Sequence, residues 1–162
     1  MSLQIRRAVA DDWAAVKALR LQALAEAPWA YGSTLEREQD FPEQTWRFRL
    51  TSNLTFLAWE HGRLVGTASG YVDPDAAAES VQLVAMYVEP GTRGTGCANG
   101  LIDAVVLAAA ADGAQRVLLD VTEVNGAAAR CYRRYGFVET GRRHPLPHSP
   151  EIAQLEMMLE LP

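Results

Sequence analysis

The spacing of apolar positions in the first quarter of the chain predicts a short strand followed by two helices. Residues 3–5 alternate as a strand, and Asp11 is placed to cap a helix that Pro28 ends. The segment 29–41 is rich in aromatic and acidic residues and is long enough to predict a functional loop. Pro42 suits the first turn of a second helix through about residue 50. The apolar positions that recur at helical spacing in the first helix are Trp13, Val16, Leu19 and Leu24.

The middle of the chain is dominated by strand patterns. Two β-rich runs, 54–59 and 64–72, are separated by His61-Gly62, which is typical of a tight hairpin turn. The next run, 81–88, is apolar at nearly every position, as expected for a central strand that is covered on both faces. It leads directly into a glycine-rich stretch, so a loop rich in glycine follows this strand.

The last third alternates helix, strand and helix before two further strand-like pieces. A helix after the glycines ends at Gly113, a buried strand covers 117–121, and Asn125 caps another helix that ends at Gly136. We expect the segment 144–150, which contains prolines, to be a loop between the final two strands. The fold class is therefore α/β of the α+β type, with a mixed, mainly antiparallel sheet of six to seven strands flanked by about four helices.

Composition narrows the class of protein. The chain has 162 residues, 49% of them apolar and 22% charged, which predicts a single globular domain over 1–162. The net charge of -5 argues against a nucleic-acid-binding surface. We find no membrane-spanning stretch and no signal peptide, so we expect a cytoplasmic protein. Two cysteines and three scattered histidines give no metal-site spacing, and we expect no metal.

The glycine-rich stretch Arg93-Gly94-Thr95-Gly96-Cys97-Ala98 lies between a strand and the start of a helix. Such a loop directs unpaired backbone N–H groups and the positive end of the helix dipole at one point, which suits a phosphate or pyrophosphate. A Walker loop is excluded because this stretch contains no lysine, which the Walker pattern requires after its last glycine. A dinucleotide fingerprint is weak because Asn99 occupies the third glycine position. A plain connecting turn is the structural alternative.

This stretch, following a strand that ends Met86-Tyr87-Val88, resembles the Arg/Gln-x-x-Gly-x-Gly/Ala motif of the GCN5-related N-acetyltransferases. A second motif of that family, an Asn followed seven residues later by Tyr and then by Gly-Phe, is similar to Asn125, Tyr132 and Gly136-Phe137. The order of strands and helices along the whole chain also fits that fold.

The resemblance implies an acetyl-CoA-dependent N-acetyltransferase. The loop amides would bind the pyrophosphate of coenzyme A, the strand before the loop would pair with the pantetheine arm, and Asn125 would hydrogen-bond that arm. The cofactor-binding residues implied in this way are Met86, Tyr87, Val88, Arg93, Gly94, Thr95, Gly96, Cys97, Ala98 and Asn125.

Acyl transfer from a thioester to an amine needs an acid, an oxyanion donor and a base. By the resemblance, Tyr132 is the general acid that protonates the leaving thiolate, and a backbone N–H of Val88 or Met86 serves the oxyanion. The identity of the general base is not determined, because Gln82 occupies the position at which the family often carries Glu. The other candidates are an ordered water chain and Glu79, Asp73 and Asp75. A covalent route through Cys97 is a minor alternative.

The loop between the first two helices lines the acceptor pocket in this family. Trp29 and Tyr31, together with Gln82, are therefore candidate acceptor-binding residues, and the acidity of Glu36 and Glu38 would suit a cationic amine. A solvated surface loop is the alternative. We expect direct transfer in a ternary complex to a small-molecule or peptide amine. A non-catalytic acyl-CoA sensor, a nucleotide-binding domain and homodimerisation through an edge strand remain open.

Overall fold

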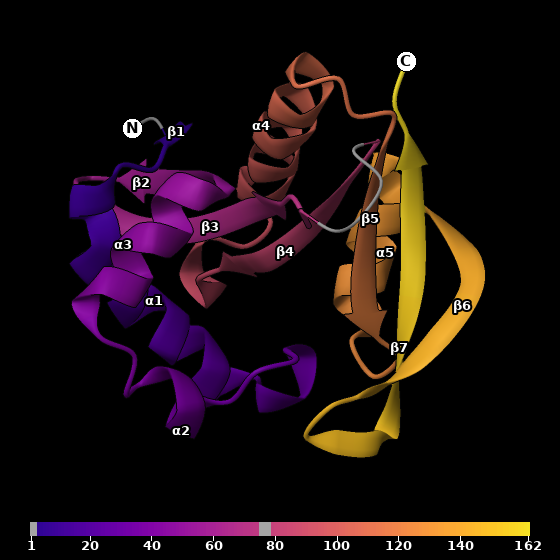
Figure 1. The fold of residues 1–162 in the computed structure, drawn as a ribbon, viewed down its shortest axis with the longest axis horizontal. Coiled ribbons are helices and arrows are strands. Elements are labelled where there is room, and N and C mark those ends of the chain that lie inside the picture. Colours follow the sequence, from indigo (N-terminus) through magenta and orange to yellow (C-terminus); the bar gives the residue numbers. More distant parts are fainter. Residues whose placement is uncertain (1–2, 75–78) are drawn as a thin grey trace.

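The computed structural model describes residues 3–74 and 79–162 (Figure 1). The strands are β1 (Gln4–Arg7), β2 (Leu54–Glu60), β3 (Arg63–Tyr71), β4 (Ser80–Val88), β5 (Arg116–Thr122), β6 (Val138–Leu146) and β7 (Ser149–Glu160). The α-helices are α1 (Trp13–Glu26), α2 (Leu35–Glu38), α3 (Glu43–Ser52), α4 (Cys97–Ala111) and α5 (Gly126–Tyr135). Three single-turn 3-10 helices are η1 (Ala10–Asp12), η2 (Pro28–Ala30) and η3 (Pro90–Thr92).

The seven strands of the described part of the chain form one sheet in the order β1-β2-β3-β4-β5-β7-β6. Within the described residues, β4 and β5 are paired in parallel and the other neighbouring strands are paired antiparallel. The predicted fold class is therefore confirmed. The crossover from β4 to β5 runs through α4, as a parallel connection requires.

The two faces of the sheet carry different hydrophobic clusters. Along β2, Leu54 and Ala58 belong to a cluster with α4 and α5, whereas Leu57 belongs to a cluster with α1 and α3. This alternation follows from the two-residue period of a strand. In Figure 1, α1 and α3 lie against the β1–β4 side of the molecule, and α5 lies beside β5 and β7.

A bulge in β4 opens the centre of the sheet. Thr67 pairs with Tyr87 but Ser69 pairs with Val84, so β4 contains one residue more than β3 between these pairs, and Ala85 takes a φ of 54°. The parallel pairing of β4 with β5 ends at Gln82. Beyond this point the two strands diverge, as Figure 1 shows, and leave unpaired main chain on both.

The turn between β2 and β3 and the start of α1 were both predicted from local sequence patterns. The tight hairpin is confirmed, because His61 and Gly62 have φ values of 53° and 73° and join paired strands. The prediction of Asp11 as helix cap is wrong: α1 follows Asp12, whose carboxylate accepts a hydrogen bond from the Val9 amide and binds Arg6. The 3-10 turn η1, which includes Asp11, precedes α1, so the α-helix begins only after Asp12.

The expected loop over 144–150 is also wrong. β6 continues to Leu146 and β7 begins at Ser149, so only Pro147 and His148 form the turn. Pro145 is tolerated because β6 is an edge strand, where a missing N–H costs no ladder hydrogen bond on the open side.

Among the described residues, no helix is long and apolar enough to cross a membrane.

Candidate functional site

The glycine loop leads to the start of α4 with its backbone donors unused. Gly94 and Gly96 have φ values of 79° and 89°, which explains why glycine stands at these positions. Gly96 is the cap residue of α4 and no side chain caps the helix. Within the described parts of the chain, the backbone hydrogen bonds around the loop leave the N–H groups of Gly94, Thr95 and Gly96 without an acceptor. This is the donor arrangement that an anion needs.

Main-chain groups of β4 face the gap between the strands. The Glu89 amide donates to the Val65 carbonyl at 2.9 Å. Because hydrogen-bonded residues alternate along an antiparallel ladder, Tyr87 directs its main-chain groups towards β3, and Met86 and Val88 direct theirs towards β5. The strand therefore offers polar main chain to whatever lies in the gap.

Two side chains hold the carbonyl groups of this strand. Arg93 Nε donates to the Val88 carbonyl at 2.8 Å, and its Nη2 binds Glu26 at 2.7 Å. The Tyr31 hydroxyl donates to the Met86 carbonyl at 3.1 Å. Arg93 is thus folded back onto β4, and Tyr31 reaches the edge of the gap from the loop after α1.

Tyr132 lies on the buried side of α5. Its side chain is 8% exposed and packs edge-on against Phe137, with ring centroids 5.9 Å apart. Burial raises the pKa of the Tyr132 phenol, and the nearby Cys131 and Tyr31 add to that rise. The hydroxyl therefore keeps its proton at neutral pH.

Asn125 and Cys97 have clear structural roles. The predicted helix cap is confirmed, because Asn125 Oδ1 accepts a hydrogen bond from the Ala128 amide at 3.3 Å. No hydrogen bond between described residues uses its Nδ2 group. The Cys97 thiol is buried in the core, and this burial, with a contribution from Glu60, raises its pKa to about 11. Such a thiol is not a nucleophile at neutral pH, which argues against the covalent route.

Asp120 is a further candidate site residue, which the sequence did not indicate. It lies on β5 two residues after the last parallel pair, at the point where the strands diverge. Gln82 donates to its Oδ2 at 3.3 Å and His144 Nε2 lies 3.1 Å from the same oxygen. Oδ1 is buried and has no hydrogen-bond partner among the described residues. Burial raises the pKa of Asp120, Glu156 adds to the rise, and His144 and Gln82 oppose it.

The other carboxylates considered as bases lie elsewhere. Glu79 directly precedes β4 at the end where β4 and β5 are still paired, and it lies 3.9 Å from Arg116. Asp73 follows β3 at that same end of the sheet. Asp75 lies outside the described residues. Next to Gln82, the nearby carboxylate is that of Asp120 on the neighbouring strand β5.

The loop between α1 and α3 does not present the acidic surface that its composition suggests. Glu38 is fully buried and binds both Arg20 and Arg49, at 3.1 and 2.9 Å. Glu36 is exposed, and Trp29 is 40% exposed on η2, which contacts β5. The expectation that Glu38 meets a cationic amine is therefore wrong, because its charge is already neutralised.

Comparisons with known proteins agree with this geometry. The model of the "Acetyltransferase (GNAT) family" matches residues 21–137. An uncharacterized N-acetyltransferase of Mycobacterium tuberculosis and one of Mycobacterium bovis are each 40% identical to this chain over 82 residues, which is 51% of this chain and 51% of each relative. The chain thus matches about half the length of these curated relatives.

Solved structures share the fold at low sequence identity. A GNAT-family acetyltransferase from Streptococcus pneumoniae has a TM-score of 0.86 at 20% identity, covering 99% of this chain and 100% of that one. The putative acetyltransferase yncA of Salmonella typhimurium, solved with its cofactor acetyl-CoA, has a TM-score of 0.81 at 20% identity, covering 100% and 95%. Because the family model matches most of this chain, the resemblance seen in the sequence is confirmed: this chain belongs to the acetyltransferase (GNAT) family.

Proposed function

We propose that the chain is an acetyl-CoA-dependent N-acetyltransferase that transfers the acetyl group directly, in a ternary complex, to a primary amine of a small molecule or peptide. The observation that carries the proposal is the gap between β4 and β5, which opens after Gln82. Unused amides of the glycine loop lie at one end of this gap, and buried Tyr132 belongs to the same core cluster as Val88 of β4 and Val121 of β5.

The residues present fit coenzyme A. Backbone N–H groups of Gly94 to Ala98 would hold the pyrophosphate, with the positive end of α4 adding to the attraction. Main-chain groups of Met86 and Val88 and the Nδ2 of Asn125 would bind the pantetheine arm. Acetyl-CoA, when bound, supplies the acetyl group as an activated thioester. The acetyl-CoA reported with the Salmonella protein supports this choice of ligand.

Two side chains would then move the protons. Tyr132 enters the reaction protonated, because burial raises its pKa, and it would donate that proton to the leaving sulfur. Asp120 would accept a proton from the incoming ammonium group through its unpartnered Oδ1. As the C–N bond forms and the C–S bond breaks, the second proton that the nitrogen loses would restore the Tyr132 hydroxyl. Gln82 and His144 hold Oδ2 and so fix the direction of Oδ1. An amide N–H of β4 would stabilise the negative charge on the acetyl oxygen.

The test is an amine panel in which thiol release from acetyl-CoA is followed for the wild type and for Tyr132→Phe. We expect the substitution to lower turnover by at least about 100-fold, the usual contribution of a general acid, with acetyl-CoA affinity nearly unchanged. Tyr135→Phe is the matched control, since the Tyr135 hydroxyl binds Asp103 at 2.5 Å on the exposed surface. Unchanged turnover in Tyr132→Phe would remove its role. Binding of acetyl-CoA without thiol release on any amine would favour the sensor.

Three wider expectations belong to the same proposal. The chain is expected to fold as one domain over 1–162 and to work in the cytoplasm. A homodimer could form through β6, the edge strand near the C-terminus, which is exposed along almost its whole length. Size-exclusion chromatography with light scattering measures that assembly directly.

A further inference from the structure

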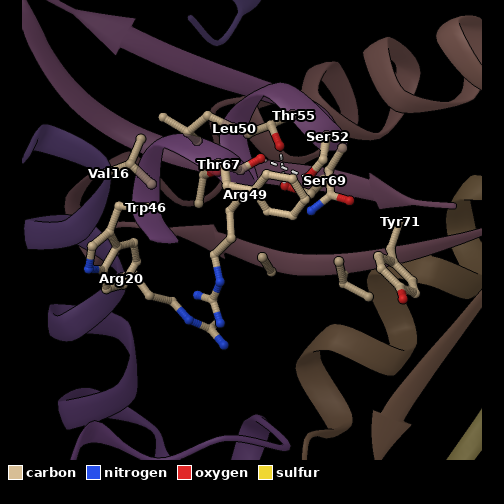
Figure 2. Close-up of a pocket in the computed structure, with 14 residues that line it drawn as sticks. Val16, Arg20, Trp46, Arg49, Leu50, Ser52, Thr55, Thr67, Ser69 and Tyr71 are labelled. Atoms are coloured by element: carbon tan, nitrogen blue, oxygen red, sulfur yellow. Dashed lines mark hydrogen bonds between the residues drawn. The ribbon is translucent and has the colours of Figure 1, made fainter. Parts of the chain in front are cut away.

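A cavity of about 410 Å³ lies between the helices α1 and α3 and the strands β2, β3 and β4. Figure 2 shows its lining, with hydroxyl groups of Thr55, Thr67 and Ser69 on the sheet side. Val84 and Ala85 of the β4 bulge complete the wall on the side of the gap. A molecule in this cavity therefore lies against the strand that would hold the acetyl group.

The charge of the lining is positive. Arg20 and Arg49 are the charged residues that line the cavity, and no carboxylate of the described residues is among the lining. Figure 2 shows their guanidinium groups projecting from α1 and α3 towards one another. Both donate hydrogen bonds to the buried Glu38, which does not line the cavity and which fixes the positions of the two guanidinium groups. Two guanidinium groups against one carboxylate leave one positive charge in excess.

Hydrogen-bond donors remain for a ligand. Arg20 binds Glu38 through Nε and Nη2, which leaves Nη1, and Arg49 binds it through Nη1, which leaves Nε and Nη2. No hydrogen bond within the described residues uses these three nitrogens. Nε and Nη2 of one guanidinium form the fork that suits a carboxylate or another planar or tetrahedral oxyacid.

A single aromatic ring joins this cavity to the proposed reaction centre. The Arg20 guanidinium lies 4.9 Å from the centre of the Tyr31 ring. The hydroxyl at the other end of that ring donates to the Met86 carbonyl at the gap. Burial raises the pKa of the Tyr31 hydroxyl to about 12, so it remains a neutral donor. One tyrosine side chain thus spans the distance between the Arg20 guanidinium and the gap.

We propose that this cavity selects amines that also carry an anionic oxyacid group, in the simplest case the carboxylate of an amino acid. Arg49 and Arg20 bind the anion, the apolar wall of Val16, Leu50 and Val84 accepts the body of the molecule, and the amine lies towards Ala85. A polyamine or another purely cationic acceptor meets excess positive charge here and is disfavoured. The inference rests on the proposed acetyltransferase function.

The first experiment needs no variant. Acetyl transfer by the wild type is measured on matched sets that share one carbon skeleton: phenylalanine, phenylalaninamide and phenethylamine, and the corresponding leucine set, together with 1-aminoalkylphosphonates. The free acids should exceed the amide and the decarboxylated amine by about 10- to 100-fold in kcat/KM, the range expected for charge-assisted hydrogen bonds. The phosphonates distinguish selection of carboxylate from selection of oxyacids in general. Equal rates within each set, or a preference for the decarboxylated amine, would overturn the inference.

The second experiment compares two arginines of the same helix. Arg49→Gln removes one guanidinium and leaves Glu38 bound by Arg20, so the ratio of acid to amide rates should fall towards one. Arg47→Gln is the control, because Arg47 binds Asp11 and Glu43 away from the cavity and its loss should leave the ratio unchanged. A ratio that Arg49→Gln does not alter would count against the role of Arg49. If Arg49→Gln does not fold, the wild-type series decides.

Calorimetry separates the two levels of the proposal. Phenylalanine and phenylalaninamide are titrated into the protein saturated with coenzyme A. If no amine is acetylated but the acid binds and the amide does not, the acetyltransferase proposal fails and the anion site stands. If amines are acetylated with no difference between acid and amide in rate or in heat, the anion site fails and the acetyltransferase proposal stands.

Discussion

Replacing Glu38 by Gln tests how the two arginines of the cavity are held. Glu38 has no solvent exposure and receives hydrogen bonds from Arg20 on α1 and Arg49 on α3. Glutamine keeps the size of the side chain and removes its charge, so it stands for the protonated form of the acid. The expected cost is therefore the electrostatic contribution of the ionised carboxylate.

The magnitude follows from the pKa. Burial by itself raises the pKa of Glu38, but the hydrogen bond and charge of Arg20, with further hydrogen bonds from Ser33 and Arg49, lower it from 4.5 to about 2. That shift corresponds to roughly 3 kcal/mol of folding stability. Because the pKa in the folded state is below that of the unfolded chain, the stabilisation is complete above about pH 5.5 and is lost as the pH falls from 4.5 to about 2.

Urea unfolding of the wild type and of Glu38→Gln between pH 3 and 7 measures this difference. We expect the free energy of unfolding of the variant to be lower by roughly 3 kcal/mol at pH 7, and we expect this difference to decrease steadily below about pH 5. The matched control is Glu43→Gln, which removes an exposed pair with Arg47 and should cost less than about 1 kcal/mol. A difference for Glu38→Gln that is small at pH 7, or that does not change with pH, would refute the electrostatic reasoning.

Three further substitutions give distinct outcomes. Asp120→Asn should lower kcat/KM by about 100-fold and abolish the acidic limb of the pH–rate profile, a limb that in the wild type lies above the usual aspartate range because burial raises the pKa of Asp120. In urea unfolding, Gly70→Ala should cost about 1–3 kcal/mol, since its Cβ would lie 2.9 Å from Val81 Cγ1. Gly100→Ala should stay within about 1 kcal/mol, because its Cβ meets only the flexible end of Ile5 and alanine favours the helix.

Local patterns predicted the elements well because each depends on near neighbours. Glycine with a positive φ ended α4 at Gly113, and Asn125 capped α5, as the sequence indicated. The errors arose where tertiary contacts decide. The extra turn η1 moved the start of α1 past Asp11, and pairing with β7 held Pro145 and its neighbours in a strand.

The main-chain donors of the candidate site were easier to predict from the sequence than the surroundings of its charged side chains. Main-chain donors follow from the glycine loop, whereas Asp120 acquires its surroundings from Gln82 and His144, which lie far away in the sequence. The one available signal was an acidic residue inside an otherwise apolar strand. Glu38 likewise appears solvated in the sequence, and only the packing of α1 against α3 encloses it between two arginines.

Calorimetric titration with coenzyme A and with pantetheine tests the central claim most directly. The claim is that the amides from Gly94 to Ala98 hold the pyrophosphate while β4 holds the arm. It predicts binding of one coenzyme A per chain and binding of pantetheine, which lacks the pyrophosphate, that is weaker by at least about 100-fold. Absence of heat with coenzyme A, or equal affinity for the two molecules, would contradict it.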